Sequence, residues 1–487
     1  MRISHIAATL LVTVALGGCS PTAGSHGILG ALRRLEVGPD YARPATEMPE
    51  RFRGQPESID PASLADLPWW EVFGDPALQQ LVREALQHNY DLETAVARVE
   101  QFHAQVGVAA ADLYPQIGYQ GAASREKAFV PILPGGNRTF NDFSAALDVA
   151  WEIDIWGRIR RATESARAQF LASEDVRRGV MLTLVSDVAA GYFQLLELDR
   201  EREIARSSAE AYQHTLALFT DRFEGGKDTK LSTSRAEASL QASVATIARL
   251  EQAIIKQEDA LSELAGAPPG PIERGHPLVE QSSPTTPVGL TTELLQRRPD
   301  IVRAEHDMMS ANAEIGVAVA NFFPRIGLTA LYGGESGKIG DVLKNNFSIW
   351  NVAGSMAGPI FQGGRLVEQY HARQAFWDES IAAYKATIVR ALREVADGLA
   401  AQSKLVDERA AEERQVEALA TAVDLSLLRY RTGLATYFEV LEAEQQLYPA
   451  QDQLAQSQRD QLLTVVGLYK ALGGGWKLTD AAWTTVQ

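Results

Sequence analysis

The chain has 487 residues, and its 46 Lys and Arg against 62 Asp and Glu give a formal net charge of −16. With 46% hydrophobic and 22% charged residues it is not a disordered chain, and it lacks the several apolar runs of about 20 residues that a polytopic helical membrane protein needs. The acidic balance argues against a nucleic-acid partner. The single Cys excludes a disulfide framework and a Cys-cluster zinc site.

Residues 1–18 are predicted to be a signal peptide. Arg2 supplies a positive start, and an apolar run from Ile6 to Leu16 follows that is too short to span a bilayer. The run ends in Leu-Gly-Gly directly before Cys19, which resembles the bacterial lipoprotein signal. The resemblance implies that Cys19 becomes residue 1 and carries covalent lipid, and that Ser20 after it favours the outer membrane. The alternative is a soluble secreted protein with an incidental Cys.

The two halves of the chain repeat one pattern, which predicts an internal duplication. Residues 222–229 align with 429–436 at an offset of 207, and residues 114–118 align with 323–327 at an offset of 209. A Pro-rich linker separates the two copies. The predicted divisions are 1–18, an N-terminal segment at 19–74, repeat 1 at 75–266, the linker at 267–290, repeat 2 at 291–473 and a tail at 474–487.

Each repeat predicts a helix, two strands, a very long helix, a Gly-centred turn and a shorter helix. The helical ranges are 75–112, 158–222 and 229–266 in the first copy and 291–321, 365–431 and 436–472 in the second. A helix of about 65 residues is about 100 Å long. Apolar residues step by three or four from Val180 to Leu198, which is typical of a coiled-coil seam. Pro449 is expected to kink the last helix.

The strand at 143–154 alternates strictly between apolar and polar side chains. Its apolar face would carry Phe143, Ala145, Leu147, Val149, Trp151 and Ile153. A strand of about ten residues with this alternation is typical of a membrane β-barrel, with lipid on one side and water on the other. Weaker strands are expected at 116–124, 325–332 and 346–357, the last with a bulge between Ile349 and Trp350.

Four strands cannot close a barrel, and an open sheet edge is not tolerated in lipid. The chain is therefore expected to pool strands with copies of itself, which gives eight strands in a dimer or twelve in a trimer. Alternation alone also fits a soluble β-sandwich, and the helices alone also fit a fibrous coiled coil without a lumen.

Several motifs occur in a characteristic order: 37–44 (VGPDYARP), 69–78 (WWEVFGDPAL), 297–301 (RRPDI), 358–361 (GPIF) and 469–476 (YKALGGGW). Together they resemble the TolC-like outer-membrane factors, the channel lipoproteins of tripartite efflux pumps. The resemblance covers about residues 37–476. One departure is the segment 20–36, which separates Cys19 from the first motif and whose role is not predicted.

The resemblance implies a mainly α fold with a membrane β-barrel. Three chains would contribute four strands each to a 12-stranded barrel in the outer membrane of a Gram-negative cell, and their long helices would form a coiled-coil α-helical barrel in the periplasm. An equatorial region would come from the N-terminal segment, the linker and the C-terminal segment. The resemblance implies that the chain forms a homotrimer. The implied partners of the trimer are a periplasmic adaptor, an inner-membrane proton-driven transporter and outer-membrane lipid.

The resemblance further implies that the helical turns at 222–232 and 429–442 narrow the periplasmic entrance. The residues carried over to this gate are Glu439, Glu442, Asp228, Arg429 and Arg222. Three-fold symmetry would make each carboxylate a ring, which favours cations, and the two arginines would pair across neighbours. The alternative is that these are solvated charges on helix faces. Ala435 stands where some relatives carry a basic gate residue.

No catalytic constellation and no metal spacing is found. Residues 333–338 suggest a phosphate loop, but its first Gly is missing and Ile339 replaces the Ser or Thr, so a surface turn is expected there. We predict a passive export duct for small molecules such as drugs, without enzymatic activity and without a cofactor other than the lipid on Cys19. Alternatives are a duct for protein (type I) secretion or for metal ions, a structural coiled-coil envelope lipoprotein, or a secreted enzyme.

Overall fold

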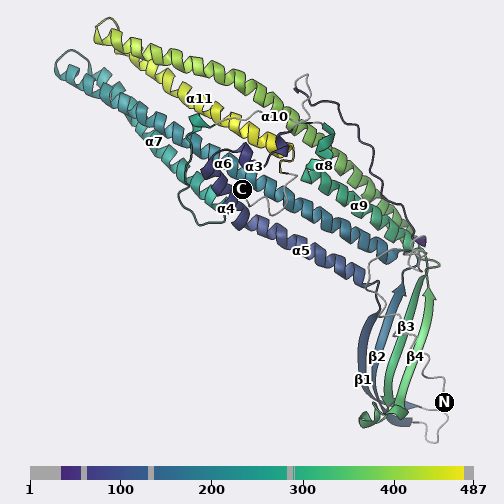
Figure 1. Cartoon of the computed structure of the whole chain (residues 1–487). Helices are drawn as coiled ribbons and strands as arrows, with labels where there is room; N and C mark the ends of the chain where they lie inside the picture. Colours follow the sequence, from purple (N-terminus) through teal and green to yellow (C-terminus); the bar gives the residue numbers. More distant parts are fainter. Residues whose placement is uncertain (1–34, 56–62, 130–136, 282–288, 290, 476–487) are drawn as a thin grey trace. The chain divides into compact units, whose positions relative to one another are not determined.

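The computed structural model describes residues 35–55, 63–129, 137–281, 289 and 291–475 (Figure 1). The predicted signal peptide, Cys19, nearly all of the segment 20–36 and the tail beyond 475 lie outside the described residues. The chain divides into two compact units. Of the described residues, those within Met1–Asp40, Val108–Glu164 and Ala313–Gln374 form the strand unit, and those within Tyr41–Gly107, Ser165–Asn312 and Ala375–Gln487 form the helical unit.

The strand unit holds one antiparallel sheet in the order β1-β2-β3-β4. Its strands are β1 (Gln116–Phe129), β2 (Asn137–Ile153), β3 (Arg325–Ser336) and β4 (Ser348–Ala357). The sequence predicts all four strands but makes β1, β2 and β3 too short, with β2 beginning at Asn137 and not at Phe143. Within the described residues β1 and β4 each pair on one side only, so the sheet has two open edges.

The register places the apolar positions of all four strands on one face. Leu147 pairs with Tyr119 on one side and with Tyr332 on the other, and Tyr332 pairs with Trp350. Trp350 is 74% exposed and Tyr119 is 89% exposed, so this face carries large apolar side chains without cover from the chain itself. The opposite face carries polar residues such as Asp148 and Glu152, as the alternation in the sequence predicts.

Two details of the predicted strands are wrong. The expected bulge at Ile349 is absent, because β3 and β4 pair without interruption from Arg325 with Ala357 to Gly334 with Ser348. Ile349 lies on the polar face opposite Gly333, which has no side chain, so the strand keeps its alternation without a bulge. Residues 333–336 extend β3 instead of forming the expected surface turn.

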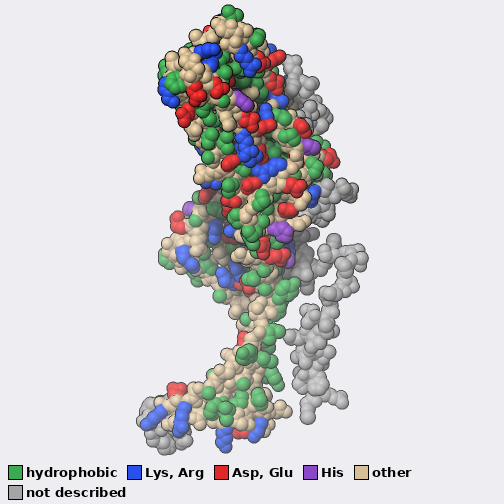
Figure 2. All heavy atoms as spheres, turned by 90° about the vertical axis from the view of Figure 1, so that its left-hand side faces the viewer, with side chains coloured by type: hydrophobic (Ala, Val, Ile, Leu, Met, Phe, Trp, Pro, Cys, Tyr) green, Lys and Arg blue, Asp and Glu red, His purple; other side chains and the backbone are tan. Residues whose placement is uncertain are grey.

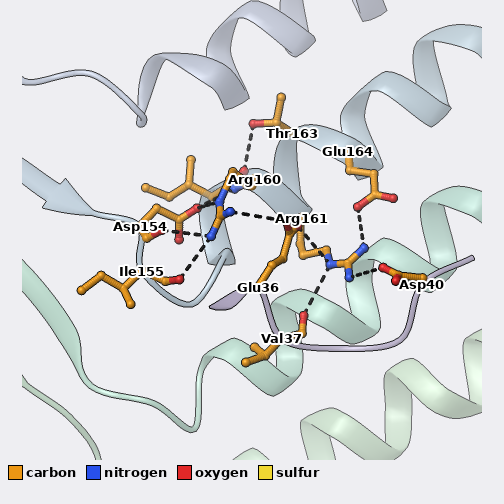
Figure 3. A network of polar contacts seen from close by, with 10 residues as sticks. Glu36, Val37, Asp40, Asp154, Ile155, Arg160, Arg161, Thr163 and Glu164 are labelled. Carbon is orange, nitrogen blue, oxygen red and sulfur yellow. Dashed lines mark hydrogen bonds and ion pairs between the residues drawn. The ribbon is translucent and has the colours of Figure 1, made fainter. Parts of the chain in front are cut away.

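A polar network ties the segment 36–40 to the beginning of the long helix α6 (Arg158–Glu224) within the strand unit (Figure 3). Arg161 is 5% exposed and contacts Glu36 at 3.2 Å, Asp40 at 2.9 Å and Glu164 at 2.8 Å. Arg160 contacts Asp154 and Glu36 at 3.3 and 3.4 Å. A cation that is buried needs such partners, so this network fixes the path of the chain that follows the predicted lipid anchor.

The helices come in matched pairs, which confirms the internal duplication. α5 (Tyr90–Ala111) and α9 (Pro299–Ala320) have 22 residues each, and α6 and α10 (Arg365–Arg431) have 67 each. α7 (Lys230–Leu264) and α11 (Tyr437–Ala471) have 35 each, and α11 continues through Pro449. The helix predicted at 75–112 is two helices, α4 (Pro76–His88) and α5, because Asn89 is extended and its side chain accepts from Leu92 N.

In the helical unit each long helix packs against the shorter helix that follows it, as the paired ribbons in Figure 1 show. A Cβ on Gly191 would lie 2.8 Å from Leu261, and a Cβ on Gly398 would lie 2.6 Å from Leu468. Both residue pairs occupy equivalent positions in the two repeats, so the same close approach is built twice. The contact relies on Gly because a larger residue would push the helices apart.

Among the described helices one, α6, is long and apolar enough to cross a membrane by length and composition, with a mean hydropathy of 1.4 over 18 residues. Of that window 61% is buried inside the protein. Val188, Tyr192 and Leu195 within α6 are fully buried in the main core, which is typical of a core helix. Along the helical part, Figure 2 shows acidic and basic side chains interspersed over the viewed surface.

Candidate functional site

The two turns predicted to form a gate have the same backbone. In the first, Lys227 N donates to Arg222 O at 2.8 Å, and in the second, Leu434 N donates to Arg429 O at 2.8 Å. The residue inside each turn is a Gly with positive φ, +67° at Gly226 and +75° at Gly433. This is the helix-ending arrangement that Gly favours, and it explains why the Gly-centred turns could be found from the sequence.

In the first turn, between α6 and α7, the carboxylate of Asp228 is bound by groups of the same turn. Asp228 accepts from Thr229 N and from the hydroxyl of Ser232, both at 2.7 Å, and Arg222 lies 3.8 Å from it. The side chain of Asp228 is only 16% exposed. Asp228 therefore caps its own turn, and within the chain Arg222 faces this carboxylate.

The second turn, between α10 and α11, leaves its carboxylates more accessible. Arg429 lies 3.7 Å from Glu439, whose side chain is 45% exposed. Glu442 is exposed, one turn further along α11, and has no ion pair in the described part of the chain. The structure thus brings Arg429 and Glu439 together within one chain and presents Glu442 to solvent, as a lining position requires.

An aromatic cluster beneath the two turns joins the two hairpins, and sequence reasoning missed it. Phe219 of α6 is fully buried against Tyr430 of α10 and Tyr437 of α11, with ring centroids 5.9 and 4.2 Å away. The guanidinium of Arg222 lies 5.2 Å from the centre of the Tyr430 ring, a cation–π contact. The three rings come from three different helices, so no pattern within a single helix marks the cluster.

A buried carboxylate lies one helical turn beyond Val440 in α11. Glu444 is 2% exposed, and one of its oxygens has no hydrogen-bond partner among the described residues. Burial raises the pKa of Glu444 to about 7, so the group gains a proton far more readily than an exposed Glu. The tyrosines that face it are Tyr212, Tyr437 and Tyr448. Sequence reasoning missed Glu444 because nothing in the pattern separates it from exposed Glu residues.

The second candidate surface is the apolar face of the sheet. The residues predicted to face lipid, Phe143, Leu147, Val149, Trp151 and Ile153, share that face with the apolar residues of β3 and β4. Trp151 Nε1 donates to Leu113 O at 2.9 Å, which satisfies the indole donor. Among the described residues there is no group of three or more His, Cys, Asp or Glu placed to hold a metal ion.

The sequence model of the outer membrane efflux protein family matches residues 81–267 and again residues 290–474. The chain is 33% identical over 450 residues to the toluene efflux pump outer membrane protein TtgI of Pseudomonas putida, covering 91% of the chain and 96% of that protein. It is 30% identical over 445 residues to a probable outer membrane lipoprotein, SilC, of Salmonella typhimurium, covering 91% and 96%. The solved outer-membrane channel OprN is similar at a TM-score of 0.84 and 29% identity, covering 90% and 99%.

Proposed function

The chain belongs to the outer membrane efflux protein family and is the outer-membrane channel component of an efflux system. From this premise we propose that three copies join edge to edge, so that their twelve strands close one barrel through the outer membrane. The observation that carries the proposal is the sheet itself, which has one apolar face and two open edges. An open edge would leave backbone donors and acceptors unpaired in lipid, and pairing β1 of one copy with β4 of the next removes them.

The apolar face would contact lipid, and the polar face would line the pore. Phe143 to Ile153 covers ten residue steps, about 33 Å along a strand, and a strand tilted by about 40° spans the roughly 25 Å apolar band of outer-membrane barrels. Asp148 and Glu152 on the opposite face support a water-filled lumen. A duct of this kind performs no reaction and takes its energy from elsewhere.

The helical turns would form the periplasmic entrance. In a three-fold assembly Glu439 and Glu442 each become a ring of carboxylates, which attracts cations. The intrachain pairs Arg222 with Asp228 and Arg429 with Glu439 support a resting state in which the turns are held in place. Efflux channels of this family work in tripartite pumps, and docking of a periplasmic adaptor would separate the turns while an inner-membrane proton-driven transporter supplies the energy.

The predicted lipid on Cys19 would hold the chain in the outer membrane before its barrel assembles, and the probable lipoprotein SilC supports this. The network around Arg161 would hold the chain after residue 36 against the strand unit. Mass spectrometry of the mature protein tests the anchor. Covalent lipid is expected on Cys19. The variant Cys19→Ser is expected to carry no lipid and still to assemble. An unmodified mature Cys19 would refute the anchor.

The cargo is proposed to be small apolar molecules, as the name of the toluene efflux relative suggests. Planar-bilayer recording of the purified full chain, together with its native mass, tests the assembly and the pore in one preparation. A mass of three chains and discrete ion conductance are expected. A monomer that carries no current would overturn the proposal, and a conducting dimer would overturn the twelve-stranded barrel alone.

A further inference from the structure

The loop between β3 and β4 folds back onto the apolar face of the sheet. Gly334 and Ser336 point to that face, and both are buried while Glu335 between them is exposed. The carbonyl oxygen of Val342 lies so close to Gly334 that a Cβ there would approach it to 1.8 Å. Val342 itself is 6% exposed. The residues 338–347, named here the flap, therefore cover the end of this face.

Besides the buried Val342, the flap carries two large apolar side chains that are mostly exposed. Leu343 is 89% exposed and Ile339 is 74% exposed, although a loop in water has no need for either. Lys338 and Lys344 stand next to them, and Lys344 lies 2.6 Å from Asp341. Exposed apolar residues beside cations are typical of a segment that lies at a membrane interface.

Between the flap and the sheet lies a hollow of about 630 Å³. Tyr119, Leu147 and Tyr332 of the apolar face line it, and Leu343 and Lys344 of the flap line it as well. Its wall is thus continuous with the face that, under the proposed function, contacts lipid. A hollow of this size with a cation in its wall can hold part of an acyl chain near a negatively charged group.

Two further cations stand on the same face beyond the hollow. The pairing of β1 with β2 runs without a bulge, so Arg125 and Lys127 point to the same side as Tyr119. Arg125 pairs with Asn141, two residues past Phe143, and thus lies just outside the apolar band of about 25 Å. Neither cation has an ion pair among the described residues. In Figure 2 Lys and Arg gather at the free end of the strand part, at the bottom of the view.

We propose that the hollow and these cations form a binding site for a phosphorylated glycolipid of the outer leaflet. An acyl chain would pack on Tyr119 and Tyr332, and phosphate groups would contact Lys344 and the Arg125 and Lys127 pair. The two separate cationic positions suit a lipid that carries more than one phosphate. The inference rests on the proposed function, because it takes the apolar face as the lipid-contacting side of the barrel.

Native mass spectrometry of the purified full chain with added lipid A tests the site, with bilayer conductance measured on the same samples. The variant Arg125→Gln, Lys127→Gln, Lys344→Gln is expected to bind lipid A at least about tenfold more weakly, which corresponds to about 1.4 kcal/mol. The matched variant Lys256→Gln, Lys385→Gln, Lys404→Gln removes three exposed cations from the helices and is expected to bind as the unaltered chain does. Both variants are expected to conduct.

A second variant leaves every charge in place. In Gly334→Ala the new methyl group meets Val342 O, so the flap must lift and the hollow must open. Lipid A binding is expected to weaken in this variant too, and dephosphorylated lipid A is expected to bind the unaltered chain about tenfold less well than lipid A. Equal binding of lipid A by the charge variant, or equal binding of the dephosphorylated lipid, in a protein that conducts would overturn the site alone. A protein without conductance would overturn the proposed function.

Discussion

The two repeats can be compared at the C-terminal ends of their shorter helices, α7 and α11, which are named here the junction ends. Gly266 after α7 has φ +68°, and a Cβ there would lie 2.1 Å from His88 O. Gly473 after α11 has φ +74°, and a Cβ there would lie 2.7 Å from Arg297 O. These positions are equivalent at the offsets of 207 and 209 found in the sequence. Both copies therefore have the same close contact at the junction end, between a Gly with positive φ and a backbone carbonyl.

A second contact at the junction ends is kept with different side chains. In the first copy Asn89 Nδ2 donates to Leu264 O at 3.0 Å, and in the second copy Arg298 Nη1 donates to the equivalent Ala471 O at 2.9 Å. Arg298 also pairs with Asp300 and Glu394, both at 2.7 Å. The carbonyl at the end of each helix needs a donor, and either residue supplies one.

The turn ends differ in charge although their backbones are the same. Residues 222–235 hold four basic and two acidic residues, whereas residues 429–442 hold two of each. Asp228 is replaced by Ala435, Ser232 by Glu439, and Arg235 by Glu442. The comparison teaches that geometry constrains the junction, while the electrostatics of the turns were free to diverge. A charge-selective entrance is therefore best sought in the second copy.

The largest effect is expected from breaking the backbone contact at the junction. Gly266→Ala puts a methyl group against His88 O and forces an Ala into positive φ, so the loss of stability is expected to be about 3 kcal/mol or more. Gly473→Ala is expected to cost somewhat less, because its contact is longer. Thermal unfolding in detergent, followed by circular dichroism of the helices, measures both.

The matched control for this prediction lies in the turn. Gly226 has almost the same φ, +67°, but nothing stands within 4 Å of a Cβ there. Gly226→Ala is expected to cost only about 1 kcal/mol, from backbone strain alone. If Gly226→Ala lowered the melting temperature as much as Gly266→Ala does, the contact with the carbonyl would not be what constrains the junction.

A smaller effect is expected from the buried carboxylate, for which the first copy again supplies the control. Glu444 is 2% exposed, whereas its equivalent Glu237 is exposed. Burial raises the pKa of Glu444 from 4.5 to about 7 in the folded chain, so the folded state favours the protonated form. The contribution of the protonated Glu444 side chain to the stability of the fold is fully present below about pH 4.5 and is lost as the pH rises through about 7.

Glu444→Gln removes this pH dependence and is expected to leave stability at pH 4.5 nearly unchanged. At pH 8 the variant is expected to be more stable than the unaltered chain by on the order of 2 kcal/mol, because it no longer buries a charge. Glu237→Gln is expected to change neither value. Melting temperatures of the two variants and the unaltered chain, measured at pH 4.5 and pH 8, test this prediction. If both substitutions changed the melting temperature equally at pH 8, the carboxylate of Glu444 would be solvated.

Much of this architecture follows from the sequence, because repetition and alternation are long-range patterns. The offset of 207 aligns Arg222 with Arg429 from the sequence alone, and the alternation from Phe143 to Ile153 predicts one face of β2 correctly. The split at Asn89 was missed, since an Asn inside an amphipathic pattern does not by itself mark a helix end. The bulge at Ile349 was predicted wrongly, because the empty position opposite it, Gly333, becomes visible only when the strands are paired.

The site was less accessible to sequence reasoning than the fold. The turns could be located, but the contacts between hairpins could not, since Phe219 and Tyr437 are far apart in the sequence and meet only through packing. The same holds for Glu444, whose burial depends on Tyr212 from a different helix. Sequence patterns report how one element is built, whereas pKa shifts and clusters arise between elements.

The smallest effect is expected where the two turns differ in charge. In Glu439→Gln with Glu442→Gln, the permeability of cations over anions in planar bilayers is expected to fall about twofold, which corresponds to about 0.4 kcal/mol because the groups are exposed and screened. Glu210→Gln with Glu417→Gln, which removes two exposed carboxylates from the long helices, is expected to leave selectivity unchanged. The reverse exchange in the first copy, Ser232→Glu with Arg235→Glu, should raise cation preference. Unchanged selectivity in all three variants would mean that neither turn lines the conducting path, and the divergence between the copies would then need another cause.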